Sequence, residues 1–182
     1  MRKLIVSEFM TLDGVMEAPE TWQFPYFSDD MAEYIKEQIL ASDVMLLGRV
    51  TYETFAGYWP NVTTNEFGIA DKLNSSPKFV VSSMLDRVAW NNSTLIKSNV
   101  LGEIMRLKQE QPNGIIGTTG SATLVQSLMD ADLVDEYQLT VHPVVLGGGK
   151  RLFREGDTAK LKLVETRAFS AGVVLLRYHP DR

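Results

Sequence analysis

Three segments of the sequence join an apolar stretch to a turn rich in glycine and hydroxyl-bearing residues. They span residues 48–51 (GRVT), 82–83 (SS) and 117–122 (GTTGSA). In an open α/β sheet, the carboxyl ends of the strands and the N-termini of the following helices bind anions through free backbone amides. Arg49 adds one fixed positive charge, so the three segments together suit a ligand that carries more than one phosphate. The alternative is three ordinary turns, because such junctions favour Gly and Ser for geometric reasons.

Two carboxyl side chains stand where they could act on a substrate. Glu8 interrupts the apolar stretch LIVSEFM, where an ionised side chain is unusual, so a proton donor with a raised pKa is one interpretation. The other is a carboxylate paired with a backbone group or an arginine. Asp13 follows the same stretch and is better placed to reach a substrate, although Asp13-Gly14 is also a common turn sequence. Glu8 and Asp13 are therefore the candidate catalytic residues.

An aromatic segment follows, MEAPETWQFPYF at residues 16–27, which is too irregular for a helix or a strand and long enough to be functional. Trp22 and Phe24 could wall a flat heteroaromatic substrate by stacking. Equally, the aromatic side chains could pack this loop against the helix that we expect next. The residue types alone leave both interpretations open.

Composition excludes several classes of protein. With 182 residues, 45% hydrophobic and 23% charged, we expect residues 1–182 to form a single domain. A net charge of −5, without a cluster of Lys and Arg, argues against a nucleic-acid surface. Zero cysteines and two histidines make a metal site unexpected. The first strand lacks the features of a secretory signal and no apolar run could span a membrane, so we expect a cytoplasmic protein.

Alternating strands and helices must position these residues. Apolar and β-branched stretches predict strands at 3–12, 43–47, 78–82, 94–96, 114–116 and 135–147, with a terminal hairpin at 161–180. Helical periodicity and capping residues predict helices at 28–41, from 49 onward, and at 66–74, 101–110 and 123–129. The expected fold class is α/β, with a central mainly parallel sheet, an antiparallel C-terminal hairpin and helices on both faces.

The order and spacing of the motifs resemble the dihydrofolate reductase superfamily. The most similar branch is related to the C-terminal reductase domain of the bacterial bifunctional riboflavin biosynthesis deaminase/reductase. The resemblance covers nearly the whole chain and is carried by SEFMTLDGVM, VMLLGRVTYETF, FVVSS, GSATLVQSLMDADLVDEYQLTVHPVVLGGGKRLF and the closing hairpin. It implies the three-layer fold of that superfamily and an NADPH-dependent reductase.

The resemblance also implies where NADPH would bind. Gly48, Arg49 and Thr51 would hold the adenine-side phosphates, Ser82 and Ser83 would join Arg49 at the 2′-phosphate, and the helix start near residue 120 would lie beneath the pyrophosphate. Asp13 and Gly14 are similar to the flexible loop that closes over the nicotinamide. The candidate cofactor contacts are Gly14, Gly48, Arg49, Thr51, Ser82, Ser83, Gly117, Gly120, Ser121, Ala122 and Thr123.

For the substrate, the resemblance implies a small heterocycle, and the strongest likeness is to the enzyme that reduces 5-amino-6-(5-phosphoribosylamino)uracil in riboflavin biosynthesis. Thr140 lies on the strand that faces the site in the resemblance and would hydrogen-bond the substrate, or would simply be a cross-strand β-former. Ala32 stands where folate reductases carry a carboxylate, which weighs against a true dihydrofolate reductase. A related enzyme for another pterin or carbonyl, and a non-catalytic NADPH-binding regulatory protein, are the alternatives.

Two further expectations concern the backbone and the partners. Thr119 replaces the first glycine of a pair that the superfamily commonly joins by a cis peptide bond, and we expect a trans bond because a non-proline cis bond costs about 3 kcal/mol. The late strands and LGGGKRLF could form a homodimer interface, as in relatives. We expect neither a nucleic-acid nor a membrane partner.

Overall fold

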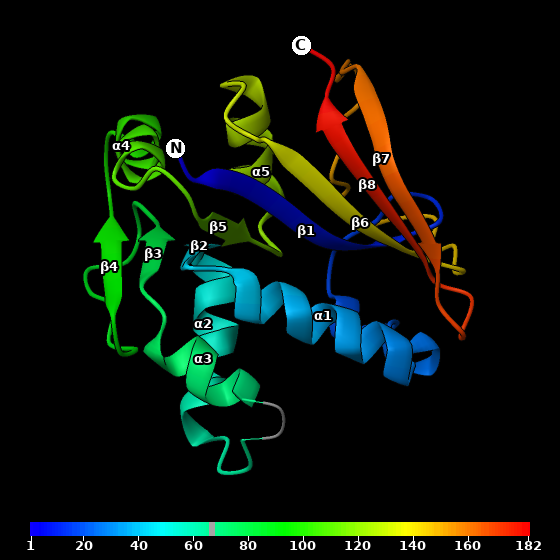
Figure 1. The fold of residues 1–182 in the computed structure, drawn as a ribbon, viewed down its shortest axis with the longest axis horizontal. Coiled ribbons are helices and arrows are strands. Elements are labelled where there is room, and N and C mark those ends of the chain that lie inside the picture. Colours follow the sequence, from blue (N-terminus) through cyan, green and yellow to red (C-terminus); the bar gives the residue numbers. More distant parts are fainter. Residues whose placement is uncertain (66–67) are drawn as a thin grey trace.

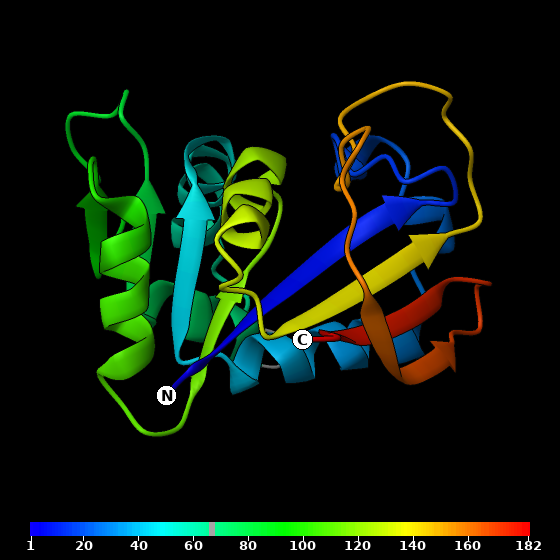
Figure 2. The ribbon, with the colours of Figure 1, turned by 90° about the horizontal axis from the view of Figure 1, so that it is seen from above.

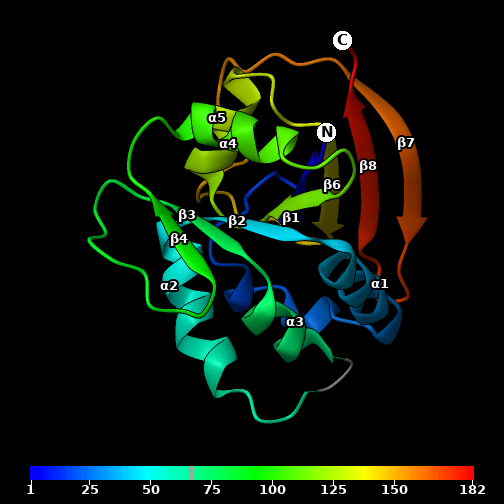
Figure 3. The same ribbon diagram turned by 60° about the vertical axis from the view of Figure 1, so that its left-hand side comes forward.

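An eight-stranded sheet with the order β4-β3-β2-β5-β1-β6-β8-β7 forms the centre of the computed structural model, which describes residues 1–65 and 68–182. Helices α1, α2 and α3 lie on one face of this sheet, and α4 and α5 lie on the other (Figure 1, Figure 3). The three-layer α/β fold predicted from the sequence is therefore confirmed. None of the described helices is both long and apolar enough to cross a membrane.

Six neighbouring strands of the sheet are parallel, and the C-terminal hairpin is antiparallel. The strands are β1 (Lys3–Thr11), β2 (Val44–Gly48), β3 (Lys78–Val81), β4 (Ser93–Ile96), β5 (Ile115–Thr118), β6 (Glu136–His142), β7 (Leu161–Ala168) and β8 (Val174–Pro180). β8 pairs antiparallel with both β6 and β7. The strand expected at 135–147 already ends at His142, because Pro143 has no amide hydrogen with which to continue the ladder.

Four of the helices follow the predicted segments within one residue at each compared end, and α3 begins later than predicted. They are α1 (Asp29–Ala41), α2 (Arg49–Tyr58), α3 (Ile69–Ser75), α4 (Val100–Gln109) and α5 (Ala122–Asp130), with short 3-10 turns at Pro19–Thr21, Phe24–Tyr26 and Trp59–Asn61. The helix expected at 66–74 agrees with α3 in its later part. Its first two residues, 66 and 67, lie outside the described residues.

Apolar side chains cover both faces of the sheet, as expected for parallel strands between two helical layers. On one face Leu4 and Ile116 pack with Leu128 in a core next to α4 and α5. On the other face Met45 and Leu47 pack with residues of α2 and α3. The central strands are thereby fixed on both sides, which holds their carboxyl ends in place.

Strand β1 is shared unequally between its two neighbours. Its pairing with β5 ends at Val6, which lies opposite Thr118, whereas its pairing with β6 continues to Thr11. Figure 2 shows β1 (blue) and β6 (yellow) running obliquely to β2 (cyan). The sheet therefore parts at its carboxyl edge, between the end of β5 and the second half of β1.

Candidate active site

A cavity of about 1000 Å³ adjoins the point where the sheet parts. Strands β1, β5 and β6 contribute Ser7, Glu8, Thr118, Gln138 and Thr140 to its lining. Strand β2 adds Met45 and Leu47, and most of the remaining, largely apolar wall comes from α1, α2, α3, the loop before α1 and the 3-10 turn after α2. Their aromatic residues include Phe24, Phe27, Tyr34, Phe55, Tyr58 and Trp59. A volume of this kind, with aromatic walls and a few polar groups, is typical of a site for an organic molecule.

Glu8 is the buried carboxyl of this cavity, with only 3% of its surface exposed. Both of its side-chain oxygens accept the amide hydrogen of Gly120, at 2.9 Å for Oε1 and 2.8 Å for Oε2. Burial raises the pKa of Glu8 to about 8, against the lowering effect of the hydrogen bond from Gly120. Near neutral pH Glu8 is therefore largely protonated, which is the state that a general acid requires.

Asp13 has the opposite character and a different position. Its carboxylate accepts hydrogen bonds from the Thr11 hydroxyl at 2.6 Å and from the amides of Gly147 at 2.8 Å and Leu146 at 3.3 Å. The Thr11 hydroxyl, followed by these amides, lowers the pKa of Asp13 to about 2. Asp13 thus joins the loop after β1 to the loop after β6, and it is not among the described residues that line the cavity. Its catalytic role stays a prediction.

The starts of α2 and α5 lie against each other, which brings two of the predicted phosphate-binding segments together. A Cβ atom added at Gly48 would lie 2.2 Å from the Ser121 hydroxyl oxygen, and one added at Gly120 would lie 2.5 Å from that of Thr51. Only glycine permits this approach. Neither helix has a side-chain cap at its N-terminus. The first amides of both helices therefore point to a common region without an intrahelical partner.

The amide of Gly120 differs from these because it already donates to Glu8. The backbone at Gly120 has a φ of 84°, in the left-handed region that favours glycine. All described peptide bonds are trans, including that between Thr119 and Gly120. The phosphate-binding segment predicted at residues 117–122 therefore contributes fewer free amides than expected, since these belong to the helix start from Ala122 onward.

The remaining cofactor candidates lie beside the start of α2. Arg49 is partly exposed, and its Nη1 donates to the Glu53 carboxylate at 2.8 Å. Val81 pairs with Gly48, so Ser82 and Ser83 follow the neighbouring strand at the same level. The Ser82 hydroxyl oxygen accepts the amides of the turn after β3, which leaves the exposed Ser83 as the freer hydroxyl group. The structure thus gathers the three predicted segments at one edge, and their cofactor roles stay predictions.

The predicted substrate residues divide into two groups. Phe24 and Thr140 line the cavity, Phe24 from the loop and Thr140 from β6. Trp22 lies outside the described lining, buried to 6% exposure. Its indole nitrogen donates to the Glu17 carbonyl, and its ring packs edge-on against His142 at 5.1 Å between centroids. These contacts hold Trp22 against β6 and not against α1, the helix on which the packing interpretation placed the loop, and its substrate role stays a prediction.

A polar cluster centred on Gln138 is absent from the sequence-based candidates. The hydroxyls of Ser7 and Tyr34 donate to Gln138 Oε1 at 3.0 and 3.1 Å, and Gln138 Nε2 donates to the buried Glu136 at 2.8 Å. Arg177 in turn donates to Glu136 at 3.0 Å. The signal that could have revealed this cluster is the alternation of polar residues at 136, 138 and 140 within a buried strand.

Glu136 is ionised in this cluster. Burial raises its pKa, but the hydrogen bonds from Gln138, His179 and Arg177 together outweigh that effect, so the pKa lies below its ordinary value. The negative charge of Glu136 holds the Gln138 amide in one orientation. The cluster therefore presents a fixed amide and two fixed hydroxyl groups at the wall of the cavity.

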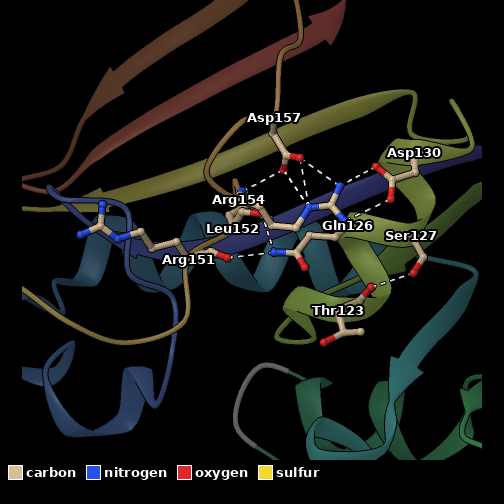
Figure 4. Close-up of polar contacts among 8 residues, drawn as sticks. All are labelled: Thr123, Gln126, Ser127, Asp130, Arg151, Leu152, Arg154 and Asp157. Carbon is tan, nitrogen blue, oxygen red and sulfur yellow. Dashed lines mark hydrogen bonds and ion pairs between the residues drawn. The ribbon is translucent and has the colours of Figure 1, made fainter.

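The segment that follows β6 is fastened to the outer side of α5. The Arg154 guanidinium lies between Asp130 of α5 and Asp157, and the Gln126 amide donates to the carbonyls of Arg151 and Leu152 (Figure 4). A second hollow, of about 460 Å³, lies here between α5 and residues 149–155. The LGGGKRLF motif is a loop after the strand, as its glycines predict.

Comparisons with known proteins agree with this architecture. The sequence matches the RibD C-terminal domain family over residues 2–175. It is 33% identical to the uncharacterized protein YyaP of Bacillus subtilis, over 98% of this chain and 95% of that protein. It is 36% identical to the uncharacterized protein YwjB of the same organism, over 73% of this chain and 71% of that protein.

Three solved structures share the fold at low sequence identity. One is a putative riboflavin biosynthesis protein from Shewanella sp. PV-4, with a TM-score of 0.76 and 20% identity; the match covers 99% of both chains. A pyrimidine reductase-like protein from Corynebacterium diphtheriae has a TM-score of 0.71 and 14% identity, with 99% of this chain and 92% of that chain covered.

The third structure is dihydrofolate reductase from Enterococcus faecalis, complexed with NADP(H) and RAB-propyl. It has a TM-score of 0.66 and 17% identity, with 99% of this chain and 97% of that chain covered. These likenesses extend over the whole sheet and both helical layers. The match over residues 2–175 shows that the chain belongs to the RibD C-terminal domain family, and the three solved structures share its fold.

Proposed function

We propose that this chain is an NADPH-dependent reductase of a small heterocyclic substrate. The observation that carries the proposal is the packing of the α2 and α5 N-termini against each other beside a large aromatic cavity. Two uncapped helix starts present free amides and the positive ends of two helix dipoles to one region. Such a region suits the pyrophosphate of a dinucleotide, and the family match supports the same interpretation.

The residues present fit this cofactor. Gly48 and Gly120 let the two helix starts approach each other, because a Cβ at either position would collide with Ser121 or Thr51. The amides at the start of α2 and at Ala122 and Thr123 would hold the phosphates. Arg49, with Ser83 at the same level of the sheet, would bind the 2′-phosphate that distinguishes NADPH from NADH. When bound, NADPH supplies a hydride to the substrate.

Glu8 would supply the proton that accompanies such a reduction. It lines the cavity, and burial raises its pKa to about 8, so it carries a proton near neutral pH. The Gly120 amide already points at its oxygens, so it stabilises the carboxylate that remains once the proton has left. With 3% of its surface exposed, Glu8 itself is shielded from solvent, which keeps the proton from being lost to water.

The family match makes 5-amino-6-(5-phosphoribosylamino)uracil the first substrate to test, with dihydrofolate and a panel of small carbonyl compounds as alternatives. We also propose a homodimer in the cytoplasm. The outer strand β7 supports the dimer, because Leu163 and Val164 are 50% and 45% exposed on an unpaired sheet edge.

Two measurements test the function in sequence. Saturating NADPH should raise the melting temperature, since a ligand at 100 times its dissociation constant stabilises a protein by about 2.7 kcal/mol. NADPH oxidation at 340 nm is then followed with each candidate substrate. An unchanged melting temperature would contradict the cofactor assignment. Stabilisation without turnover of any compound would favour a non-catalytic NADPH-binding protein instead.

A further inference from the structure

Few charged side chains surround the cavity. Among the described residues that line it, the charged types are Glu8, Asp29, Glu33 and Lys36. Lys36 donates to both oxygens of Glu33, at 2.8 and 3.1 Å, so these two charges largely offset each other. The lining is therefore neutral to slightly acidic.

Such a lining is unsuited to a phosphate. A buried phosphate group requires cationic side chains or several converging donors, because removing its charge from water is costly. Arginines that could serve are engaged elsewhere: Arg177 bonds to Glu136 and Glu165, behind the Gln138 cluster. Arg49 stands at the start of α2, in the region assigned above to the cofactor. The carboxyl side chain of Asp29 would instead repel a phosphate in the cavity.

The polar groups that do line the cavity suit an uncharged ring. Gln138 Oε1 takes the hydroxyl hydrogens of Ser7 and Tyr34, so the oxygens of these two hydroxyls are left to act as acceptors. The hydrogen bond to Glu136 keeps the Gln138 amide from flipping. Acceptors fixed in this way match N–H donors on a ligand.

Aromatic side chains form much of the cavity wall. Phe24 and Phe27 line the cavity from the loop before α1, and Phe55, Tyr58 and Trp59 line it from α2 and the 3-10 turn that follows α2. Aromatic side chains bind flat rings by stacking or edge contacts. The walls thus favour a planar ligand, and the polar cluster favours one whose edge carries N–H groups.

We infer that the substrate is an uncharged, flat heterocycle that offers ring N–H donors and carries no phosphate. This inference rests on the proposed reductase function and narrows its substrate class. It departs from the phosphoribosyl substrate to which the family points. A free base or an unphosphorylated nucleoside of a pyrimidine or pterin has the required chemistry.

Matched ligand pairs test the inference on the full chain saturated with NADPH. Calorimetry compares 5-amino-6-(5-phosphoribosylamino)uracil with the same compound after phosphatase treatment, and uridine 5′-phosphate with uridine. In each pair the unphosphorylated member should bind at least about tenfold more tightly. Equal binding, preference for the phosphorylated member, or no binding by either member of both pairs would overturn the inference.

A charge variant gives a second, independent readout. Ala32 lines the cavity on α1, so Ala32→Arg would place a cation in its wall and should shift the preference toward the phosphorylated ligand by at least about tenfold. Leu40→Arg adds the same charge at an exposed position of the same helix and should leave the preference unchanged. An unchanged preference in a folded Ala32→Arg variant would overturn the inference. The melting temperature with NADPH alone tests the cofactor separately, so either idea can fail without the other.

Discussion

Glu8 should make the stability of the protein fall as the pH rises from weakly acidic to weakly basic. Its pKa is raised from 4.5 to about 8 in the folded chain. A group of this kind stabilises fully below its unfolded pKa, and the stabilisation is lost as the pH rises through the folded pKa. Between these values the free energy of unfolding should fall by about 1.4 kcal/mol per pH unit, or on the order of 5 kcal/mol in all.

Urea unfolding at pH 5, 6, 7 and 8 measures this effect. Glu8→Gln cannot titrate but retains an oxygen acceptor for the Gly120 amide. Relative to this variant, the wild-type protein should lose about 3 to 4 kcal/mol between pH 5 and pH 8. Glu37→Gln, at an exposed position of α1, should follow the wild type throughout. Parallel stability curves for the wild type and Glu8→Gln would refute the raised pKa.

The same variant tests the proposed role in turnover. Once a substrate is known, Glu8→Gln should lower kcat by about 10² to 10⁴, the usual contribution of a general acid, while the Kd for NADPH changes by no more than about twofold. The wild-type kcat should decline above pH 8, as Glu8 loses its proton. Wild-type kcat in the variant at pH 7 would remove Glu8 from the reaction.

Three further outcomes follow from the geometry. Arg49→Ala should weaken NADPH much more than NADH in direct binding measurements, with Arg106→Ala on α4 as control; equal losses would place the 2′-phosphate elsewhere. Gly48→Ala should lower the urea midpoint, at a cost of about 1 to 3 kcal/mol, because its Cβ would collide with the α5 start. Gly57→Ala, where the added Cβ meets open space within α2, should raise the free energy of unfolding by about 0.5 to 1 kcal/mol. A similar loss of stability in both variants would argue against the close approach of the α2 and α5 starts. Leu163→Glu should convert the proposed homodimer to monomer in light scattering, and a monomeric wild type would refute the dimer itself.

Periodicity and turn chemistry were sufficient to predict most of the fold. The apolar stretches and glycines around residues 48 and 120 correctly indicated strand ends followed by helix starts. The end of β6 was placed too late, because apolar residues continue past Pro143 although the ladder does not. Pro143 lacks an amide hydrogen for the ladder, and this loss outweighs the strand propensity of the two valines that follow it.

The site was harder to predict, because it depends on contacts between residues far apart in the chain. Glu8 was identified as anomalous from its apolar neighbours, but the pairing with Gly120 spans 112 residues of sequence. Gln138 was not predicted, because a single glutamine in a strand is ordinary, and only the fold brings the hydroxyls of Ser7 and Tyr34 to it. Trp22 was grouped with Phe24 by composition, whereas the loop turns the former toward His142 and the latter toward the cavity.

The parting of β1 from β5 after Val6 has a mechanical consequence. The sheet consists of two halves, β4-β3-β2-β5 and β1-β6-β8-β7, and the pairing of β5 with β1 joins them along four residue pairs. Beyond these four pairs, the hydrogen bond between Glu8 and Gly120 links the two halves of the sheet. Because a charged acceptor binds an amide more strongly than a neutral one, loss of the Glu8 proton would strengthen this hydrogen bond. The ease with which the two halves move apart around the cavity would then depend on whether Glu8 carries its proton.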